Sequence, residues 1–165
     1  MSECCRLEVA AAEVSGPCPE CRRPGRKVER ITLKALLRPE ALAWLSASEH
    51  RFCATPSCRV AYFGRDEVFG REDLLVPVFQ KEAAEERTVC YFFAVTEGDI
   101  RREIERSGRS TASERISALV KAERCACEVR NPQGVCCLGN VMALERAQED
   151  PPRARETEGS RTVSQ

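Results

Sequence analysis

The cysteine-rich segment from Cys125 to Val141 constrains this chain more than any other part of its sequence. It holds four of the eleven cysteines, as two pairs on either side of Asn131-Pro-Gln-Gly134. Pro132 suits the second position of a type I turn and Gly134 the fourth, so a tight reversal would bring the two pairs face to face. The spacing predicts a loop that holds a metal ion or an iron–sulfur cluster. The four cysteines are Cys125, Cys127, Cys136 and Cys137.

Apolar residues at helical spacing follow this loop. Leu138, Val141, Met142 and Leu144 would lie on one face of a helix that begins just after Cys137. The partial positive charge at a helix N-terminus stabilises a thiolate. We therefore expect Cys137 to ionise readily.

Composition limits what such a chain can be. It has 165 residues, of which 5% are aromatic and 32% charged, so its apolar core is limited and would gain from metal ligation. The net charge is zero and the basic residues are dispersed, which argues against a nucleic-acid partner. No apolar run has the length of a signal peptide or a membrane span, so we expect a cytoplasmic protein without membrane insertion. In that compartment cysteines are metal ligands more often than disulfides; a secreted disulfide protein is the alternative.

Two cysteine pairs in the first half have the spacing of zinc ligands. Cys18 and Cys21 form a C-x-x-C pair that follows a polar leader and precedes a Pro-Gly turn, whereas a redox motif should follow a buried strand and open a helix. Cys53 and Cys58 flank a Pro-Ser turn about thirty residues further on. The four thiolates would close a structural zinc site, because no position is left for water. We expect His50, the only histidine, to be a bystander.

Short helices and strands are expected around these pairs. Thr32 can cap a first helix and Pro39 can open a second, with the leucines and Trp44 in the core. Pro77 implies a sheet edge or a strand end. The expected helices cover 33–37 and 40–45, and the expected strands cover 60–63 and 72–79.

The second half reads as helices with cysteines in the loops that flank them. Two capping boxes, Thr96 to Asp99 and Thr111 to Glu114, predict two helix starts. Buried structural cysteines would instead be scattered over apolar helix faces. A helical hairpin that sets the distance between ligand groups is therefore the better interpretation.

The predicted organisation has four parts. A flexible leader covers 1–16, and its adjacent Cys4 and Cys5 are read as an exposed pair, with capture of a soft metal as the alternative. The tail is rich in charged residues, Pro, Ser and Thr and is predicted to be disordered. The parts are the leader 1–16, a zinc-binding subdomain 17–80, a helical cysteine-rich iron–sulfur subdomain 81–148, and the tail 149–165.

Several motifs between residues 17 and 145 also occur in a recognisable order. They are Cys18-Pro-Glu-Cys21, Phe52-Cys53-x4-Cys58-x-Val60-x-Tyr62-Phe63, Lys81-Glu82, Val89-Cys90-Tyr91, Thr96 and Asn131-Pro-x-Gly-x-Cys-Cys137. In this combination the chain resembles the N-terminal zinc and [2Fe-2S] domain of CopZ-type copper chaperones. The second half is similar, more loosely, to bacterioferritin-associated ferredoxin, in which loop cysteines flank a helical hairpin and hold a [2Fe-2S] cluster.

This resemblance implies an α+β fold, with a treble-clef-like zinc-knuckle subdomain of short strands followed by an α-helical [2Fe-2S] ferredoxin-like hairpin. It places zinc on the two cysteine pairs of the first half. It places the cluster on Cys90, the residue two positions later, Cys127 and Cys137. At that second position this chain has Phe92, which cannot ligate iron.

A nearby thiol could replace the missing donor. Cys125 is the better candidate because residues two apart in an extended segment project to the same side, whereas the side chains of adjacent Cys136 and Cys137 diverge. The predicted cluster ligands are Cys90, Cys125, Cys127 and Cys137, with Cys136 as the alternative. Loss of the cluster, or its replacement by another thiophilic ion, is the competing prediction.

In the CopZ family a copper-binding ferredoxin-like domain follows this module, and nothing after residue 145 resembles it. The resemblance therefore implies the accessory role, which is to supply electrons or to keep copper reduced. We expect a non-enzymatic protein of copper or related soft-metal homeostasis, because no nucleotide or metalloprotease motif is present. Its partners would be a protein and copper or mercury ions. The alternative is a redox-inactive zinc-stabilised adaptor or thiolate metal-binding protein without a cluster.

Overall fold

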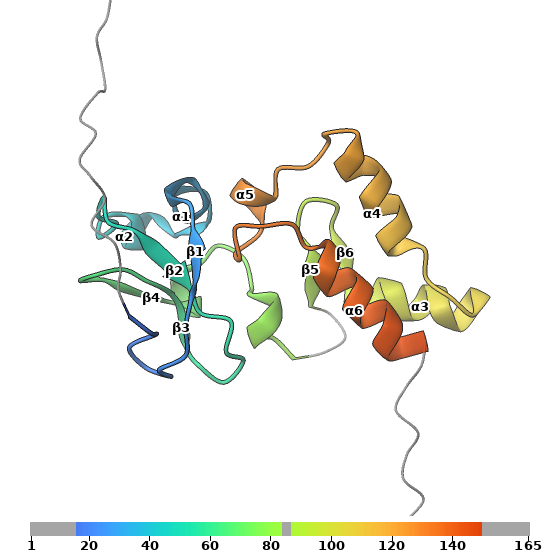
Figure 1. Ribbon diagram of the computed structural model, residues 1–165, viewed down its shortest axis with the longest axis horizontal. Helices are drawn as coiled ribbons and strands as arrows, with labels where there is room; N and C mark the ends of the chain where they lie inside the picture. The colour runs from blue at the N-terminus through green and yellow to red at the C-terminus, as the bar shows by residue number, and fades with distance from the viewer. Residues whose placement is uncertain (1–15, 84–86, 150–165) are drawn as a thin grey trace, which may run out of the picture.

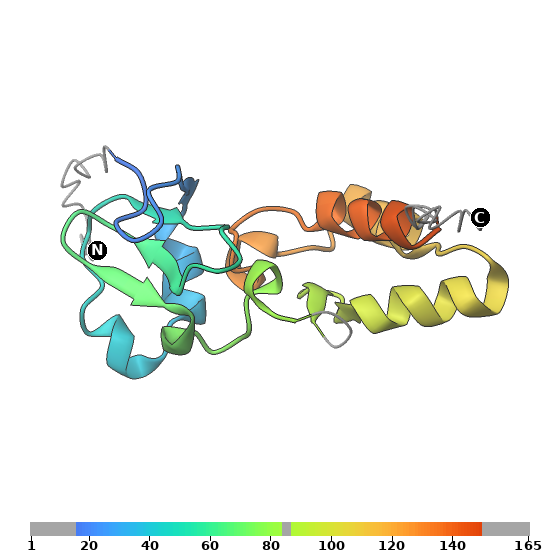
Figure 2. The ribbon, with the colours of Figure 1, turned by 90° about the horizontal axis from the view of Figure 1, so that it is seen from below.

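The computed structural model describes residues 16–83 and 87–149, which form two lobes side by side (Figures 1 and 2). The sheet lobe consists of residues 16–83, and the helical lobe of residues 87–149. The expected leader, with Cys4 and Cys5, and nearly all of the expected tail lie outside the described residues. The mixture of antiparallel sheet and helices confirms an α+β fold.

The sheet lobe is built on an antiparallel sheet in which β3 is buried along its whole length. Strand order follows chain order, and a β-bulge between Val60 and Tyr62 shifts the register of β3 against β4. Tyr62 packs into the apolar core, whereas Val60 and Phe63 pack against cysteines. β3 thus separates the core from the cysteine group. The strands are β1 Arg26–Val28, β2 His50–Phe52, β3 Val60–Phe63 and β4 Val68–Gly70.

Two short helices, α1 Arg30–Leu36 and α2 Pro39–Leu42, connect β1 to β2. Pro39 opens α2 as expected, because its missing N–H costs nothing at the first helical position. The prediction for Thr32 was wrong: α1 begins earlier, and Thr32 lies inside it with its hydroxyl bonded to the Glu128 carbonyl. Trp44 was also misplaced in the core, since its side chain is 74% exposed.

The expected strand over 72–79 does not form. Two single turns of 3-10 helix, Arg71–Asp73 and Phe79–Lys81, lie at the two ends of this segment, and between them Leu74 makes an isolated bridge to Leu37. Pro77 cannot donate to a ladder, and its carbonyl accepts the Tyr91 hydroxyl instead. The strand that follows β3 in the chain and pairs with it is β4, which sequence reasoning missed.

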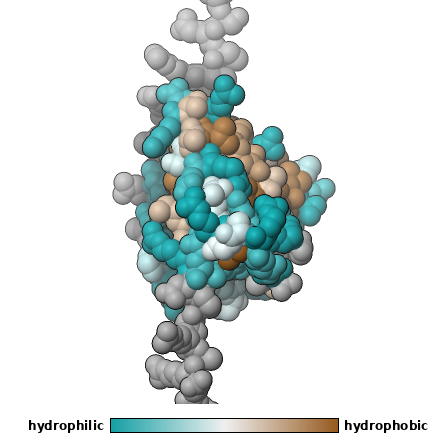
Figure 3. Space-filling view, turned by 90° about the vertical axis from the view of Figure 1, so that its right-hand side faces the viewer, coloured by the Kyte–Doolittle hydropathy of each residue, from teal (hydrophilic) through white to brown (hydrophobic). Residues whose placement is uncertain are grey.

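The helical lobe consists of a small hairpin and three longer helices. α6 packs against both α3 and α4, and the three helices enclose an apolar core that includes Val89, Ile100 and Val141. Figure 3 views this end of the molecule and shows mainly hydrophilic residues, with apolar residues in a smaller patch. The elements are β5 Thr88–Cys90, β6 Val95–Thr96, α3 Glu97–Ser107, α4 Ala112–Lys121, α5 Cys127–Arg130 and α6 Leu138–Glu149.

The two predicted capping boxes have different outcomes. Thr96 accepts a hydrogen bond from the Asp99 amide, and the Asp99 carboxylate accepts one from the Thr96 amide, which confirms the first box. α4 begins at the expected place, but Thr111 does not cap it. Its hydroxyl donates instead to a carboxylate oxygen of Glu103 on α3, at 2.8 Å. Tertiary contact has replaced the local cap.

The lobes meet where α5 packs against α1. The Tyr62 hydroxyl in the sheet core donates to the Pro132 carbonyl at 2.7 Å. Gly134 has a φ of +68°, and a β-carbon there would lie 3.2 Å from Val28 Cγ1, so both conformation and space favour glycine. The expected turn at 131–134 is confirmed by the hydrogen bond from the Gly134 amide to the Asn131 carbonyl. No helix in the described parts of the chain is long and apolar enough to span a membrane.

Candidate metal centres

The structure brings together the four cysteines that were predicted to bind zinc. Cys18 and Cys21 lie in the loop before β1, Cys53 follows β2, and Cys58 precedes β3. Their sulfur atoms all lie within 4.8 Å of one another. Cys18, Cys53 and Cys58 are buried, and Cys21 is partly exposed.

The sulfur separations fit a tetrahedral ion. Zinc–sulfur bonds of about 2.3 Å in a tetrahedron place neighbouring sulfurs about 3.8 Å apart. The Sγ atoms of Cys18 and Cys58 are 3.8 Å apart, and those of Cys21 and Cys53 are 3.6 Å apart. The residues present therefore fit a four-thiolate zinc site that leaves no coordination position for water. Such a site is structural.

Burial and hydrogen bonding shift the pKa values of these thiols in opposite directions. The Thr55 hydroxyl, 3.3 Å from Cys21 Sγ, lowers the pKa of Cys21 to about 6. Burial raises the pKa of Cys58 to about 12 and also raises the pKa of Cys18. A thiolate at these buried positions needs a compensating cation, which a bound divalent ion supplies.

His50 lies outside this group, as expected. It is buried, and its Nε2 atom lies 2.8 Å from a carboxylate oxygen of Glu67. Ser46 bonds to the same Glu67 oxygen, so the histidine belongs to a polar network inside the sheet lobe.

The second cysteine group lies in the helical lobe. Cys90 ends β5, Cys127 opens α5, and Cys137 immediately precedes α6; all three are buried. Cys90 and Cys137 are neighbours, since each thiol shifts the pKa of the other. Cys125 is partly exposed and Cys136 is exposed.

Cys90 is the thiol of this group that loses its proton most readily. The hydrogen bond from Cys137 lowers the pKa of Cys90 to about 7, and the same bond together with burial raises the pKa of Cys137 far above its ordinary value. The expectation that the helix N-terminus would make Cys137 the readily ionised thiol is therefore wrong. The interaction with Cys90, together with burial, raises the pKa of Cys137 despite its place at a helix N-terminus. Burial also raises the pKa of Cys127 to about 11, and the nearby thiols Cys136, Cys125 and Cys90 add to it.

The five thiols of the helical lobe are neighbours but do not form a compact tetrahedral group. Within residues 16–83 and 87–149, only the sheet-lobe cysteines form a group of three or more donor atoms that all lie within 4.8 Å of one another. Phe92, at the position where the CopZ pattern has cysteine, is 38% exposed and contacts Phe93 edge to face. The sulfur atoms of this group are therefore spread more widely than the ligands of a single metal ion.

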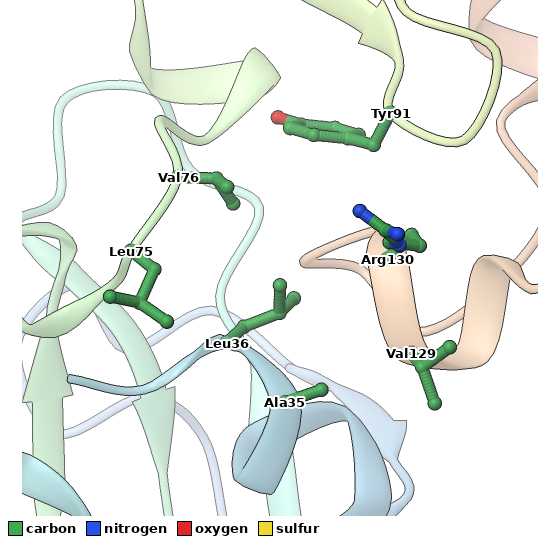
Figure 4. A pocket seen from close by; sticks show the side chains of 7 residues that line it. All are labelled: Ala35, Leu36, Leu75, Val76, Tyr91, Val129 and Arg130. Atoms are coloured by element: carbon green, nitrogen blue, oxygen red, sulfur yellow. The ribbon is translucent and has the colours of Figure 1, made fainter. Parts of the chain in front are cut away.

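A cavity of about 360 Å³ lies between the lobes beside this second group (Figure 4). Tyr91 follows Cys90 in the chain, and Val129 and Arg130 belong to the helix that Cys127 opens. Arg130 is the one charged side chain among the cavity-lining residues. The lining residues are Ala35, Leu36, Leu75, Val76, Tyr91, Val129 and Arg130.

Three residues that support the centres were missed in the sequence analysis. Thr55 lies against Cys21, and Tyr62 holds the turn that precedes Cys136 and Cys137. Lys81 was given no role of its own, yet its Nζ atom donates to the carbonyl oxygens of Thr55 at 2.8 Å and Cys58 at 2.9 Å. The nearest signal was the Lys81-Glu82 motif, which gave no direction for the side chain.

Known proteins match both lobes. A family model described as "Zinc binding domain", of the CopZ type, matches residues 15–75. The chain is 36% identical over 127 residues to the copper chaperone CopZ of Archaeoglobus fulgidus; the match covers 77% of this chain and 60% of that protein. This chain therefore spans less than two thirds of the curated relative.

The solved N-terminal domain of Archaeoglobus fulgidus CopZ has the same fold. It superposes with a TM-score of 0.67 at 32% sequence identity, and the match covers 78% of this chain and 96% of that domain. The matched region extends well beyond the residues of the zinc-binding family model, into the helical lobe. Since nearly the whole solved domain is covered at this identity, the chain belongs to the family of CopZ N-terminal domains.

Proposed function

We propose that this protein serves metal homeostasis with a structural zinc ion in the sheet lobe and a [2Fe-2S] cluster in the helical lobe. The cluster would pass one electron to a protein partner or to a metal ion. The observation that carries the proposal is the second set of thiols, in which the buried Cys90, Cys127 and Cys137 lie close enough to shift one another's pKa. A protein that needed zinc only for stability would not require this second set.

The two sites differ in the chemistry that they support. Zinc has no redox chemistry, and a closed four-thiolate site admits no substrate. A cluster held by four cysteines takes up and releases single electrons. Because a [2Fe-2S] cluster distributes its ligands over two irons, its thiolates need not all lie within contact of one another. The wider arrangement in the helical lobe suits a cluster better than a single ion.

Four cysteines are proposed as the cluster ligands. Cys90, Cys127 and Cys137 are the buried members of the group. Cys125 takes the place of the cysteine that Phe92 replaces, because it is less exposed than Cys136 and lies two residues before Cys127. Cys136 is the alternative fourth ligand.

The partner is proposed to be a protein of metal transfer. The curated relative is named a copper chaperone, which suggests copper as the metal handled by this system, with mercury as a further soft ion. The cavity beside the cluster group has one charged side chain and no pair of acid and base residues, which supports a carrier and not an enzyme. A cytoplasmic location agrees with free thiols of this number.

Anaerobic purification followed by metal and sulfide analysis tests the proposal. We expect one zinc and about two irons and two acid-labile sulfides per chain, with absorption bands between about 300 and 600 nm. Cys125→Ser should remove most of the iron and sulfide while zinc is retained. Cys136→Ser is the matched control and should retain the zinc, the iron and the acid-labile sulfide. A colourless protein without iron and sulfide would refute the cluster.

A second candidate is a redox-inactive zinc-stabilised adaptor or thiolate metal-binding protein. The observation in its favour is Phe92, which removes one family donor. This candidate predicts a colourless protein that binds a second thiophilic ion through the helical-lobe cysteines, or none. The same metal analysis separates it from the cluster.

A further inference from the structure

Lys81 is a buried lysine that forms no ion pair with a carboxylate of the described residues. The residue is 6% exposed. None of the ion pairs within residues 16–83 and 87–149 includes its ammonium group. Its contacts are with the carbonyl oxygens of Thr55 and Cys58. Removing a charge from water is costly unless an opposite charge is close, so the position of this lysine calls for an anion.

When it holds a divalent ion, the sheet-lobe metal centre is such an anion, and Lys81 binds the backbone of one of its ligand loops. Four thiolates around one divalent ion carry a net charge of about −2. Both carbonyl groups that bind Lys81 belong to the loop that contributes Cys53 and Cys58. The lysine therefore lies against the backbone of a ligand loop whose bound form is negatively charged.

The same side chain also holds the shape of that loop. Thr55 and Cys58 are already linked by a hydrogen bond from the Cys58 amide to the Thr55 carbonyl. Lys81 binds this carbonyl and the carbonyl of Cys58, so it fixes two points of the loop from outside. Thr55 in turn places its hydroxyl against Cys21 Sγ, which belongs to the other ligand pair.

We propose that Lys81 is the counter-charge and positioning residue of the four-thiolate centre. The residue comes from the segment that leads into the helical lobe, so the zinc loop is fixed by the connector between the lobes. The proposal rests on a metal ion in the sheet lobe and does not depend on the cluster.

Zinc affinity, measured by competition with a chromogenic chelator on the full reduced chain, tests the proposal. Lys81→Gln keeps a donor for a carbonyl but removes the charge, and we expect zinc affinity to fall about 10- to 100-fold. Lys81→Arg keeps the charge, so its zinc affinity should fall much less. Lys34→Gln, at an exposed lysine on α1, is the matched control and should bind zinc as the unchanged chain does.

A second measurement separates charge from shape. Cys21→His, at the partly exposed ligand, reduces the net charge of the loaded site from about −2 to about −1. In the Cys21→His background, the loss of zinc affinity caused by Lys81→Gln should be several-fold smaller than in the unchanged chain. An equal cost in both backgrounds, or wild-type affinity in Lys81→Gln, would overturn the proposal. If Cys21→His binds no zinc, the decision rests on Lys81→Arg: an affinity as low as that of Lys81→Gln rejects the counter-charge.

Discussion

The two lobes assemble their cysteines in different ways. In the sheet lobe each ligand pair lies within one short loop, so the chain only has to bring two preformed pairs together across β2 and β3. In the helical lobe Cys90, Cys127 and Cys137 come from three segments, and their proximity depends on how α6 packs against α3 and α4. The first group is compact and the second is wider. Local turns can prepare a single-ion site, whereas a wider centre depends on the packing of a whole lobe.

The difference is sharpened most by removing the metal from the sheet lobe. A structural zinc ion contributes on the order of 10 kcal/mol to folding. Removal of zinc by a chelator under reducing conditions should therefore remove the hydrogen-exchange protection of the amides in β2 and β3. The amides of α3 and α6 should lose much less of their protection. Adding zinc back is the control and should restore protection. Unchanged protection of the sheet after zinc loss would show that its apolar core suffices.

The next largest effect concerns the helical core. Ile100 is fully buried with Val89 and Val141, and Ile100→Ala should cost about 2 to 5 kcal/mol of unfolding free energy because it leaves a cavity. Denaturant unfolding measures this cost. Ile31→Ala, at a half-exposed isoleucine on α1, should cost less than about 0.5 kcal/mol. Equal costs would mean that the helical lobe gains little stability from its core.

The contact between the lobes is tested by Tyr62→Phe. The change leaves the buried Pro132 carbonyl without its donor, and we expect a loss of about 1 to 3 kcal/mol. Hydrogen exchange should show faster exchange in residues 127–135, although the substitution lies in the sheet. Tyr91→Phe, which removes a hydroxyl bonded to the Pro77 carbonyl, is the comparison and should leave this segment nearly unchanged. If both variants act alike, the turn is not held from the sheet core.

The smallest predicted effect depends on pH. The hydrogen bond from Arg115 lowers the pKa of Glu103 from 4.5 to about 2, so the ionised carboxylate stabilises the folded helical lobe. That contribution is complete above the unfolded pKa of about 4.5 and is lost as the pH falls from there through about 2. The Arg115 side chain is 56% exposed, so solvent screening reduces the contribution to about 1 kcal/mol.

Glu103→Gln tests this prediction in metal-loaded protein. The variant should be less stable than the unchanged chain at pH 6, and the difference should shrink as the pH falls below 4.5. Glu105→Gln, at a more exposed carboxylate of the same helix, is the control. A difference that stays constant with pH would mean that Glu103 acts through its shape and not through its charge.

Local signals in the sequence were sufficient for several elements. The capping box at Thr96, the start of α2 at Pro39 and the turn at Asn131 to Gly134 depend on contacts within a few residues. The segment from Glu72 to Phe79 was misread because its apolar residues satisfy a strand pattern, while Pro77 and the Tyr91 hydroxyl direct its backbone elsewhere. Trp44 was misread because α2 ends at Leu42, so Trp44 lies in the turn beyond the helix, where its side chain is exposed.

By itself the sequence determined which cysteines form pairs, because the turns between them span only a few residues. It also determined the α+β class and the starting positions of α3 and α4. Only the tertiary structure decided which thiol of the second group is readily ionised. Both the burial of these thiols and the interaction between Cys90 and Cys137 depend on the packing of α6. The packing also turned Lys81 toward the zinc loop. A lysine that is charged and solvated in the unfolded chain acquires this position only when the connector and the loop come together, and sequence spacing does not encode that contact.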